Sequence, residues 1–484
     1  MSVPPASRRI QTLVVDLDGS LIKSDLLFEG IVLIIKRNFL LLLLMPFWLL
    51  RGKAHLKRQV AARATPDASL LPYNSEIIAL IDRFAGQGAR VILGTAADAA
   101  AAQKVADQVG KFDAVLATGV AGNLAADRKL QAILREVGDA EFAYVGNARP
   151  DLAIWARSAE IYVVNPSRGV LSGLRRLGKV PTQLIDNKKP YFRSALKALR
   201  LHQWLKNVLV FVPILVGHQW QNLLSWQSSI LMFVAFGLTA SSIYVVNDLL
   251  DLDADRQHPR KRNRPFASGE LPILHGLFAA PLLLAGGIGL AFTINHMAGL
   301  LLMAYAFVST IYTMLLKRYV VVDVITLAGL YTIRILAGAA ATQIIPSFWL
   351  LAFSMFLFLS LATMKRAAEL QVLVGMGTTA AAGRNYLVQD LAAVRSMGIT
   401  SGYLSVLVLA LYMNAPEISS RYPVPQALWA MCIVLLYWLG RLWVKTDRGE
   451  MHDDPVVFAI SDWNSRVLGV MCLAIMFAAS GRWA

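Results

Sequence analysis

The chain has 484 residues, enough for two or three domains, and 56% of them are hydrophobic, which is more than a soluble protein ordinarily carries. The apolar excess lies after residue 200, which excludes a single, evenly apolar globule. The formal net charge is +16, but the cations cluster beside apolar runs, so lipid headgroups and phosphate-bearing substrates explain them better than nucleic acid does. Cys432 and Cys472 lie in apolar runs and have the spacing of neither a disulfide framework nor a metal site.

Short strand-like runs alternate with helical stretches in residues 1–166, which we expect to form the first domain. The runs at 13–15, 90–95 and 143–151 end in small or polar residues, and helical stretches such as 75–84 separate them. This alternation predicts an α/β fold with a parallel sheet and functional groups at the carboxyl ends of its strands. No apolar region of a signal peptide precedes the first run, so we expect this part to stay in the cytoplasm.

Polar and charged residues stand at the ends of these runs and in the helical stretch 128–137: Asp16, Asp18, Ser20, Thr95, Lys129, Asn147 and Asp151. With them, residues 10–165 resemble the haloacid dehalogenase (HAD) superfamily of phosphatases, which implies a Rossmannoid α/β domain. The resemblance implies that Asp16 is the nucleophile that takes a phosphoryl group and that Asp18 is the general acid/base. It also implies that Thr95 holds the phosphate, that Lys129 balances its charge, and that Mg²⁺ is held by Asp16, Asp18, Asn147 and Asp151.

The chemistry of this resemblance is sound, because a carboxylate is a competent covalent nucleophile once a metal neutralises the incoming phosphate. Two positions depart from the family pattern. Ser20 replaces the usual Thr, and Asn147 stands where an Asp usually follows the Gly, which removes one negative charge near the metal.

Residues 26–60 interrupt the α/β pattern with an apolar stretch at 39–50 that has cations on both sides. Twelve residues are short of the roughly 20 that span a bilayer. A longer segment that starts at residue 26 would include Glu29 and would put Asp16 and Asp151 on opposite sides of the membrane. We therefore expect a cap insertion that lies on the membrane surface. The alternative is a helical hairpin buried against the phosphatase domain.

Residues 167–200 carry many cations and one acidic residue, Asp186, which predicts a basic linker along the headgroups. The second domain, 201–484, contains nine apolar segments at roughly 204–220, 226–247, 273–294, 297–316, 320–342, 347–364, 396–414, 425–443 and 464–480. The loops after the second, fourth, sixth and eighth segments hold nearly all the cations. By the positive-inside rule, this predicts a multi-pass protein of a bacterial-type inner (plasma) membrane with its N-terminal domain in the cytoplasm.

The stretch 247–265 (NDLLDLDADRQHPRKRNRP) follows the second apolar segment. At about 100° per residue on a helix, Asp248, Asp251 and Asp255 fall within one narrow arc, with Asn247 beside it and Asp253 on the opposite side. Three carboxylates on one face repel each other unless a cation lies between them. Because Mg²⁺ takes few protein carboxylates and completes its shell with phosphate oxygens and water, this stretch suits a metal–diphosphate complex. The alternative is a charged loop that caps a membrane helix.

The NDxxDxxxD pattern at 247–255 makes residues 195–484 resemble the UbiA superfamily of intramembrane prenyltransferases. The resemblance implies an all-α bundle of nine transmembrane helices with a cavity open to lipid. It also implies that Asp248, Asp251 and Asp255 are catalytic and bind Mg²⁺ and a diphosphate.

Further stretches resemble one branch of this superfamily, the decaprenyl-phosphate phosphoribosyltransferases, which move phosphoribose from phosphoribosyl diphosphate (PRPP) onto a polyprenyl phosphate. They lie at 202–213, 258–265, 316–323 with Arg334 following, and 365–369, and the run at 453–463 also looks like this branch without an assigned role. Aromatic prenyltransferases usually carry a second DxxxD after the sixth helix, where this chain reads MKRAAELQ. The residues expected to hold substrate phosphates are Asn247, Lys206, His258, Lys261, Arg264, Lys317, Arg334, Lys365, Arg366 and Glu369.

A polyprenyl phosphate is already an anionic nucleophile, so its site needs cations. Topology alone is the alternative explanation for part of these cations, and Glu369 is also placed for an ordinary i,i+4 ion pair with Lys365. Arg334 and Asp323 fall inside or at the edge of an apolar segment, where charges are costly and usually functional.

The sequence thus predicts a Mg²⁺-dependent transferase that uses PRPP and a polyprenyl phosphate in a lipid membrane, fused to a phosphatase that removes the 5-phosphate from the product. The nearest alternative is transfer of a prenyl group from a prenyl diphosphate to an aromatic or other small acceptor. A transporter or lipid-binding membrane protein with a regulatory HAD-like domain is an alternative of another class, as is a phosphatase anchored by a degenerate bundle.

Overall fold

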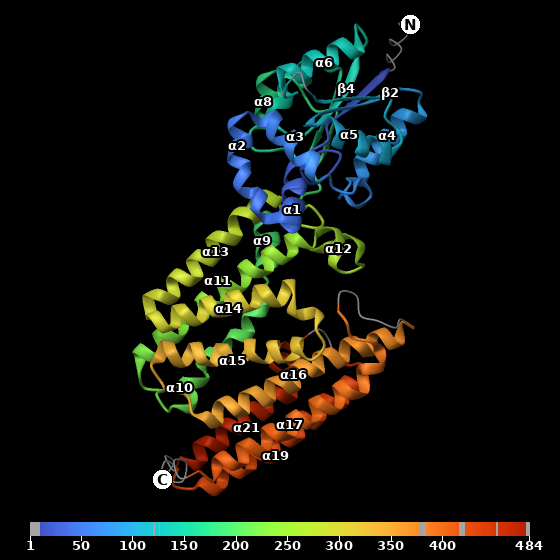
Figure 1. Ribbon diagram of the computed structural model, residues 1–484. Coiled ribbons are helices and arrows are strands. Elements are labelled where there is room, and N and C mark those ends of the chain that lie inside the picture. Colours follow the sequence, from blue (N-terminus) through green and yellow to red (C-terminus); the bar gives the residue numbers. More distant parts are fainter. Residues whose placement is uncertain are drawn as a thin grey trace, which may run out of the picture. The chain divides into compact units, whose positions relative to one another are not determined.

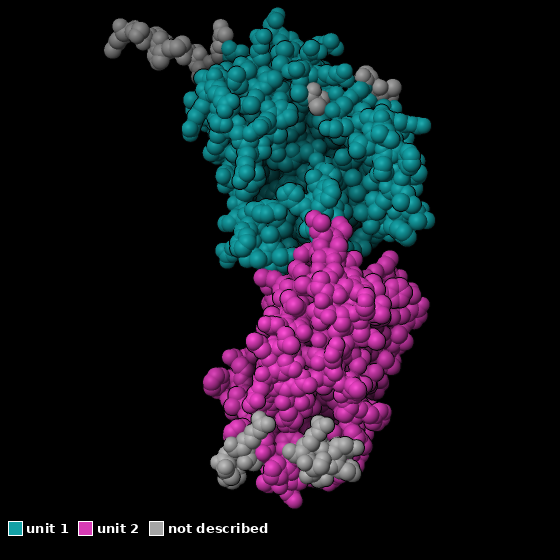
Figure 2. All heavy atoms as spheres, turned by 90° about the vertical axis from the view of Figure 1, so that its left-hand side faces the viewer, with its two compact units in different colours: residues 1–199, 244–280 teal, residues 200–243, 281–484 magenta. Residues whose placement is uncertain are grey.

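The computed structural model describes residues 10–119, 122–124, 126–377, 384–415, 422–451 and 454–480. The chain divides into two compact units (Figure 2). Unit 1 consists of Met1–Leu199 and Tyr244–Ala280, and unit 2 consists of Arg200–Ile243 and Pro281–Ala484. This division differs from the predicted one, because the acidic stretch 247–265 belongs to the same compact unit as the N-terminal domain.

Within the described residues, unit 1 contains a parallel sheet of six strands in the order β3-β2-β1-β4-β5-β6 (Figure 1). The strands are β1 (Thr12–Val15), β2 (Arg90–Asp98), β3 (Ala114–Thr118), β4 (Phe142–Gly146), β5 (Glu160–Val164) and β6 (Gln183–Ile185). β1 pairs with β2 on one side and β4 on the other, so the strand order reverses between β1 and β4. Ligands of open α/β sheets bind at such a point, beyond the carboxyl ends of the strands. The predicted parallel α/β domain is confirmed.

The alternation of side chains along β1 explains why helices cover both faces of the sheet. Leu13 and Val15 face a core that includes residues of α4 (Ser75–Gly86) and α5 (Ala99–Val109). Val14 faces the other core, with residues of α6 (Asp127–Val137), α7 (Leu152–Arg157) and α8 (Val170–Arg176). All three β1 side chains are fully buried, as expected for a strand inside a parallel sheet.

The stretch 167–200, predicted as a basic linker, is largely part of the folded unit. It contains α8, the edge strand β6 and α9 (Tyr191–Leu199), and β6 pairs with β5 in the register Val164↔Ile185. Ile185 is buried in the core of the sheet. The prediction missed β6 because this strand is three residues long and basic residues dominate its surroundings.

The predicted insertion at residues 26–60 is helical. It forms α1 (Leu26–Asn38), the 3₁₀ helix η1 (Phe39–Leu44), α2 (Met45–Leu50) and α3 (Lys53–Arg63). Residues 10–119 contain no helix long and apolar enough to span a membrane. The inner sides of these helices share a small core with Ile34, Trp48 and Val60, whereas the outer sides of η1 and α2 are exposed. The buried side fits the alternative of a packed helical hairpin, and the membrane-surface position of the exposed side stays a prediction.

The second segment of unit 1 comprises the end of α11 (Leu223–Leu250), α12 (Leu252–Gln257), η5 (Lys261–Asn263) and the beginning of α13 (Ile273–Ile294). Val245, Leu249 and Phe266 share a buried core with Val32 of α1 and Ala198 of α9. The Glu29 carboxylate of α1 also accepts two hydrogen bonds from the guanidinium of Arg256 on α12, at 2.6 and 3.1 Å. These buried contacts are the reason why the acidic stretch belongs to unit 1.

Among the described helices, seven are long and apolar enough to cross a membrane. They are α11, α13, α14 (His296–Met314), α15 (Val322–Thr342), α16 (Phe348–Gly375), α17 (Leu391–Met413) and α19 (Trp429–Asp447). The bent pairs Tyr191–Leu199 with Leu201–Val216, and Pro455–Ser461 with Trp463–Ala479, raise this number to nine if each pair is one span. The predicted multi-pass membrane protein is confirmed. The first predicted segment is not one regular helix, because it combines the 3₁₀ helix η4 (Leu201–Phe211) with the short α10 (Val212–Val216).

Candidate functional site

The first candidate site lies at the carboxyl ends of β1 and β4. Asp16 follows β1 directly, and its carboxylate accepts a hydrogen bond from Lys129 Nζ of α6 at 2.5 Å. Lys129 Nζ also lies 3.7 Å from Asp151 Oδ1, in the short helix η3 (Arg149–Asp151) after β4. All three side chains are buried. The structure therefore brings three of the predicted phosphatase residues together where the strand order reverses.

Local hydrogen bonds hold Asp18, Thr95 and Asn147 in place. Asp18 Oδ1 accepts a hydrogen bond from the first N–H of α1 at 3.0 Å. The Thr95 hydroxyl accepts the N–H two residues further on at 3.0 Å, and the Asn147 N–H donates to Asp151 Oδ2 at 3.1 Å. Gly19 has a φ of 76°, and a Cβ at this position would lie 2.1 Å from Asn147 Nδ2. The DxDGS loop therefore requires glycine at this position.

Burial sets the electrostatics of this site. Burial raises the pKa of Asp16 to about 6, although the ammonium group of Lys129 opposes the rise. Burial also raises the pKa of Asp18 well above its usual range, and the neighbouring Asp25 carboxylate raises it further. The charged forms of these carboxylates are therefore costly, and a bound cation would stabilise them.

The second candidate site is the acidic stretch. α11 ends at Leu250, and α12 begins after Asp251, whose φ of −102° and ψ of 15° break the helix. Asp248 and Asp255 are nevertheless both buried, and their carboxylates lie 3.1 and 2.7 Å from Nη1 of Arg264. Burial raises the pKa of Asp255, and the hydrogen bond from Arg264 opposes the rise. The cation expected between the carboxylates is thus Arg264, a residue predicted to hold a substrate phosphate instead.

The other residues predicted to hold substrate phosphates differ in their burial. Asn247 and Lys317 are half-buried, whereas His258 and Lys261 are exposed. His258 Nδ1 accepts the N–H of Arg260 at 3.2 Å, which fixes its ring against its own turn.

The donor chemistry of both sites fits Mg²⁺, which prefers carboxylate oxygens. Within the described part of the chain, no three Asp, Glu, His or Cys side chains converge as a ready-made metal site. Asp248 and Asp255 do converge on one cationic atom of Arg264, so this pair already binds positive charge. A pair of carboxylates is sufficient where phosphate oxygens and water complete the coordination shell.

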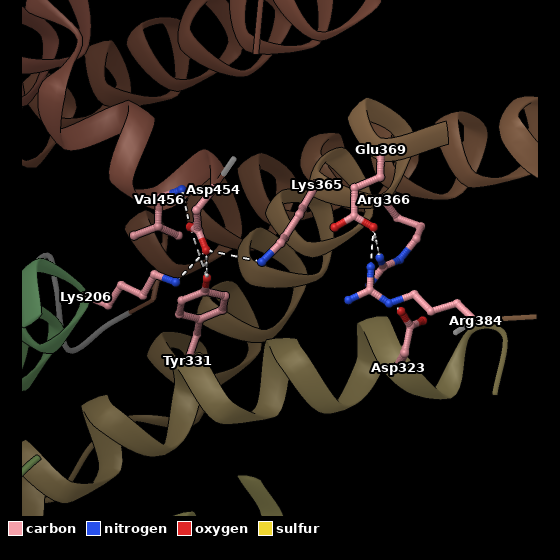
Figure 3. A network of polar contacts seen from close by, with 9 residues as sticks. All are labelled: Lys206, Asp323, Tyr331, Lys365, Arg366, Glu369, Arg384, Asp454 and Val456. Atoms are coloured by element: carbon pink, nitrogen blue, oxygen red, sulfur yellow. Dashed lines mark hydrogen bonds and ion pairs between the residues drawn. The ribbon is translucent and has the colours of Figure 1, made fainter. Parts of the chain in front are cut away.

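A third polar cluster lies inside unit 2, around Asp454 (Figure 3). Asp454 caps the short helix α20 (Pro455–Ser461), and its carboxylate pairs with Lys206 of η4. The Tyr331 hydroxyl of α15 lies 3.3 Å from both carboxylate oxygens, and Lys365 Nζ of α16 lies 3.6 Å from Oδ2. Lys206, Tyr331 and Asp454 are buried, and the Lys365 side chain is 28% exposed. Asp454 thus joins four elements that are distant in sequence.

Arg334 of α15 adds a further buried cation beside Tyr331. Its guanidinium donates to Asn207 Oδ1 at 3.1 Å and to the Tyr305 hydroxyl at 3.0 Å, both of which are uncharged. Its Cζ lies 5.6 Å from the Tyr331 ring centre, and Lys206 Nζ lies 5.8 Å from it. We call Lys206, Arg334 and Lys365 the cationic cluster. One carboxylate against three cations leaves a net positive charge in the interior of the described bundle, which favours binding of an anion.

Arg366 and Glu369, both predicted to hold a substrate, lie instead in a separate ion-pair network (Figure 3). Arg366 is fully buried between Glu369 and Asp323, with its Nη2 2.6 Å from Asp323 Oδ2. Glu369 also pairs with Arg384, and Tyr386 donates to Asp323 at 2.6 Å. Buried charges need partners, and Arg366 finds them within the protein. The i,i+4 pair of Lys365 with Glu369 is replaced by pairing with Arg366.

Asp454 is the residue that sequence reasoning missed. It lies in the run at 453–463, to which no role was assigned; Asp453 lies outside the described residues. An Asp directly before a Pro is a typical helix N-cap, and its side chain accepts the Val456 N–H at 3.1 Å. That local role hides the contact with Lys206, which is visible only in three dimensions.

A cavity of about 670 Å³ lies elsewhere in unit 2, between α14, α15 and the turn at 343–346. Its lining is largely apolar and includes Asn295, His296 and Gln343. None of the predicted site residues lines it. The chemistry of unit 2 therefore belongs to the buried charges rather than to this cavity.

The sequence model of the UbiA prenyltransferase family matches residues 210–479. The chain is 34% identical over 461 residues to the uncharacterized protein y4nM of Sinorhizobium fredii, and the match covers 95% of this chain and 89% of that protein. It is 38% identical over 280 residues to the nodulation protein NoeC of Azorhizobium caulinodans, which covers 57% of this chain and 90% of NoeC.

A decaprenyl-phosphate phosphoribosyltransferase of Mycobacterium tuberculosis is 36% identical over 185 residues, 37% of this chain and 61% of that enzyme. Among solved structures, a UbiA homolog from Archaeoglobus fulgidus bound to GPP and Mg²⁺ superimposes with a TM-score of 0.45 and 16% identity. That match covers 60% of this chain and 99% of the homolog.

Proposed function

Because the chain belongs to the UbiA prenyltransferase family, and is thus a UbiA-type membrane transferase, we propose that it transfers phosphoribose from PRPP to a polyprenyl phosphate. The observation that carries this proposal is the cationic cluster, which holds more positive than negative charge inside the bundle. A phenolic acceptor has no need of buried cations, whereas a phosphate acceptor does. The 36% sequence identity over 185 residues to the mycobacterial phosphoribosyltransferase also supports a phosphate acceptor.

In the proposed reaction an oxygen of the polyprenyl phosphate attacks the anomeric carbon of PRPP. The bond from that carbon to the diphosphate breaks, and the electron pair leaves with the diphosphate. Mg²⁺ held by Asp248, Asp251 and Asp255 would neutralise the charge that develops on this leaving group. Arg264 would move from the carboxylates to the diphosphate when a metal takes its place, since it cannot serve both.

The cationic cluster would hold the acceptor phosphate. Lys206 and Arg334 are buried, and buried cations bind phosphate more strongly than exposed ones because water does not screen them. Asn207 Nδ2 is also buried and has no hydrogen-bond partner in the described structure, so it remains available to a phosphate oxygen. Arg366 and Glu369 are left out of this proposal, because they neutralise each other together with Asp323.

For the α/β domain we propose phosphatase activity with Asp16 as the nucleophile and Asp18 as the general acid/base. The convergence of Asp16, Lys129 and Asp151 supports this proposal. Mg²⁺ held by Asp16, Asp18, Asn147 and Asp151 would neutralise the incoming phosphate. The 5-phosphate of the transferase product is the proposed substrate, and both activities would face the cytoplasm of a bacterial-type inner membrane.

The test is a transfer assay on membranes that contain the chain. Labelled PRPP with polyprenyl phosphate is compared with labelled prenyl diphosphate and a phenolic acceptor. We expect label from PRPP in the lipid fraction, and none when the Asp248→Asn variant replaces the wild type. Turnover of the prenyl diphosphate without label transfer from PRPP would overturn the proposal in favour of the prenyltransferase alternative.

A further inference from the structure

The helical insertion of unit 1 exposes an apolar ridge. We define the ridge as Phe39, Leu40, Leu43, Phe47 and Leu50, whose exposed fractions are 64, 56, 70, 64 and 84%. These residues come from the consecutive helices η1 and α2. A contiguous apolar patch of this kind on a folded domain marks a surface that binds a partner or a membrane.

The ridge is a built surface rather than a poorly packed loop, because its inner side is anchored. Trp48 of α2 is buried with Ile34 of α1 and Val60 of α3. The Arg63 guanidinium lies 4.7 Å from the centre of the Trp48 ring, which adds a cation–π contact. The exposed side chains are therefore held outward by a fixed core.

The surroundings of the ridge identify what covers it. α1 shares a buried core with Val245 and Leu249 of α11 and with Ala280 of α13, all in unit 1. Both α11 and α13 are candidate membrane spans, so the insertion packs against the ends of two such helices. Exposed cations flank the apolar stretch on both sides: Lys36, Arg37, Arg51 and Lys53. Apolar side chains between cations match the acyl boundary and the headgroups of a bilayer.

Helices α1 and α3, which flank the ridge in sequence, also line a pocket beside the candidate phosphatase site. A pocket beside Asp18 and Asp25 is lined by Leu27 of α1 and by Lys57 and Val60 of α3. Lys57 Nζ donates to the Ala96 carbonyl at 2.6 Å, which places this ammonium group at the strand end of β2. The insertion that carries the ridge therefore also lines a pocket beside the candidate phosphatase site.

We propose that the ridge inserts into the bilayer surface and that the α/β site thereby takes a phosphate carried on a membrane lipid. The proposal that the insertion enters the bilayer surface is argued from the ridge alone. The substrate part rests on the proposed phosphatase activity. A phosphomonoester has the same chemistry on a lipid and on a soluble molecule, so the source must be distinguished by experiment.

Insertion is tested by depth-dependent quenching in the full chain reconstituted into vesicles of mixed neutral and anionic phospholipids. A fluorophore is attached at Phe47→Cys, or at the exposed control Gln87→Cys, after replacing Cys432 and Cys472 with alanine. We expect lipids with nitroxide on the acyl chain to quench the label at residue 47 at least about threefold more than at residue 87. Equal quenching, or quenching that depends on protein density because a second copy covers the ridge, overturns insertion.

The substrate part is tested with the double variant Phe47→Glu and Leu50→Glu, which removes the apolar character of the ridge without touching the proposed catalytic residues. We expect hydrolysis of a lipid-linked phosphomonoester to fall at least about tenfold and hydrolysis of p-nitrophenyl phosphate to change less than twofold. An equal effect on both substrates overturns the lipid-linked substrate. If the wild type hydrolyses neither substrate, the phosphatase proposal fails, whereas the quenching result still decides insertion.

Discussion

The substitution Asp454→Asn tests whether the cationic cluster binds an anion. It removes the carboxylate that pairs with Lys206 and Lys365 while keeping the size of the side chain and an oxygen that can accept a hydrogen bond from Tyr331. The Lys206 and Asp454 side chains are 10 and 5% exposed, so this pair is buried. Removal of one partner from a buried ion pair costs about 3–5 kcal/mol, because the other charge remains without compensation.

The contact with Lys365 adds less, because that side chain is 28% exposed and pairs of this kind contribute about 0–1 kcal/mol. We therefore expect the variant to lose about 4 kcal/mol of stability. For a domain of this size that loss lowers the unfolding midpoint by roughly 10 °C. Thermal unfolding of the purified protein in detergent, followed by tryptophan fluorescence without divalent cations, measures this difference.

The decisive measurement is the same unfolding experiment with a short-chain polyprenyl phosphate. If the cluster binds phosphate, the ligand supplies the missing negative charge, and the midpoint of Asp454→Asn rises more than that of the wild type. Asp462→Asn is the matched control, since Asp462 pairs with Arg441 at 2.7 Å on the neighbouring helix and is outside the cluster. Its midpoint should fall without a larger response to the ligand. Equal responses of both variants would refute the anion site.

Three further outcomes are expected. Asp248→Asn lowers phosphoribosyl transfer by at least about 100-fold, because a metal that neutralises a leaving group stabilises the transition state by several kcal/mol. A transfer rate near that of the wild type would contradict the diphosphate site. In the folded protein the pKa of the Asp16 carboxyl is about 6, whereas its usual value is 3.8. Between these pH values the folded state binds a proton that the unfolded state does not, so metal-free stability falls by about 3 kcal/mol as the pH rises through this window. Thermal unfolding between pH 3.5 and 7 checks this slope, which Asp16→Asn should reduce by the contribution of Asp16. Glu29→Gln should cost about 3–5 kcal/mol because it leaves Arg256 buried without its carboxylate, and a double-mutant cycle with Arg256→Gln in urea unfolding should show strong coupling.

The sequence predicted the parallel sheet because apolar runs such as 13–15 are bounded by polar residues, and that pattern depends only on local spacing. β6 was missed because three residues give too short a pattern, and its pairing with β5 is what identifies it. The helical arc of Asp248 and Asp255 was predicted from periodicity, and the pair does converge on one atom. The break at Asp251 was not, since no Pro or Gly marks it.

The partners of charged side chains were the least predictable part. Lys206 and Asp454 lie 248 residues apart, and no local pattern links them. Arg366 was expected at a substrate because the stretch 365–369 resembles the phosphoribosyltransferase branch, yet its partner Asp323 comes from a different helix. Charge in a membrane segment indicates that a partner exists, but only packing determines whether that partner is a substrate or another side chain.

The composition of unit 1 has a consequence for how the chain folds during synthesis. Domains usually fold in the order in which they leave the ribosome. The sheet of unit 1 is complete once β6 has been made, but Val32 still lacks Leu249 and Phe266, which come at the end of α11 and beyond it in the chain. The N-terminal unit therefore reaches its final core only after α11, a candidate membrane span, has been synthesised, so this unit cannot mature before synthesis of the membrane part has begun.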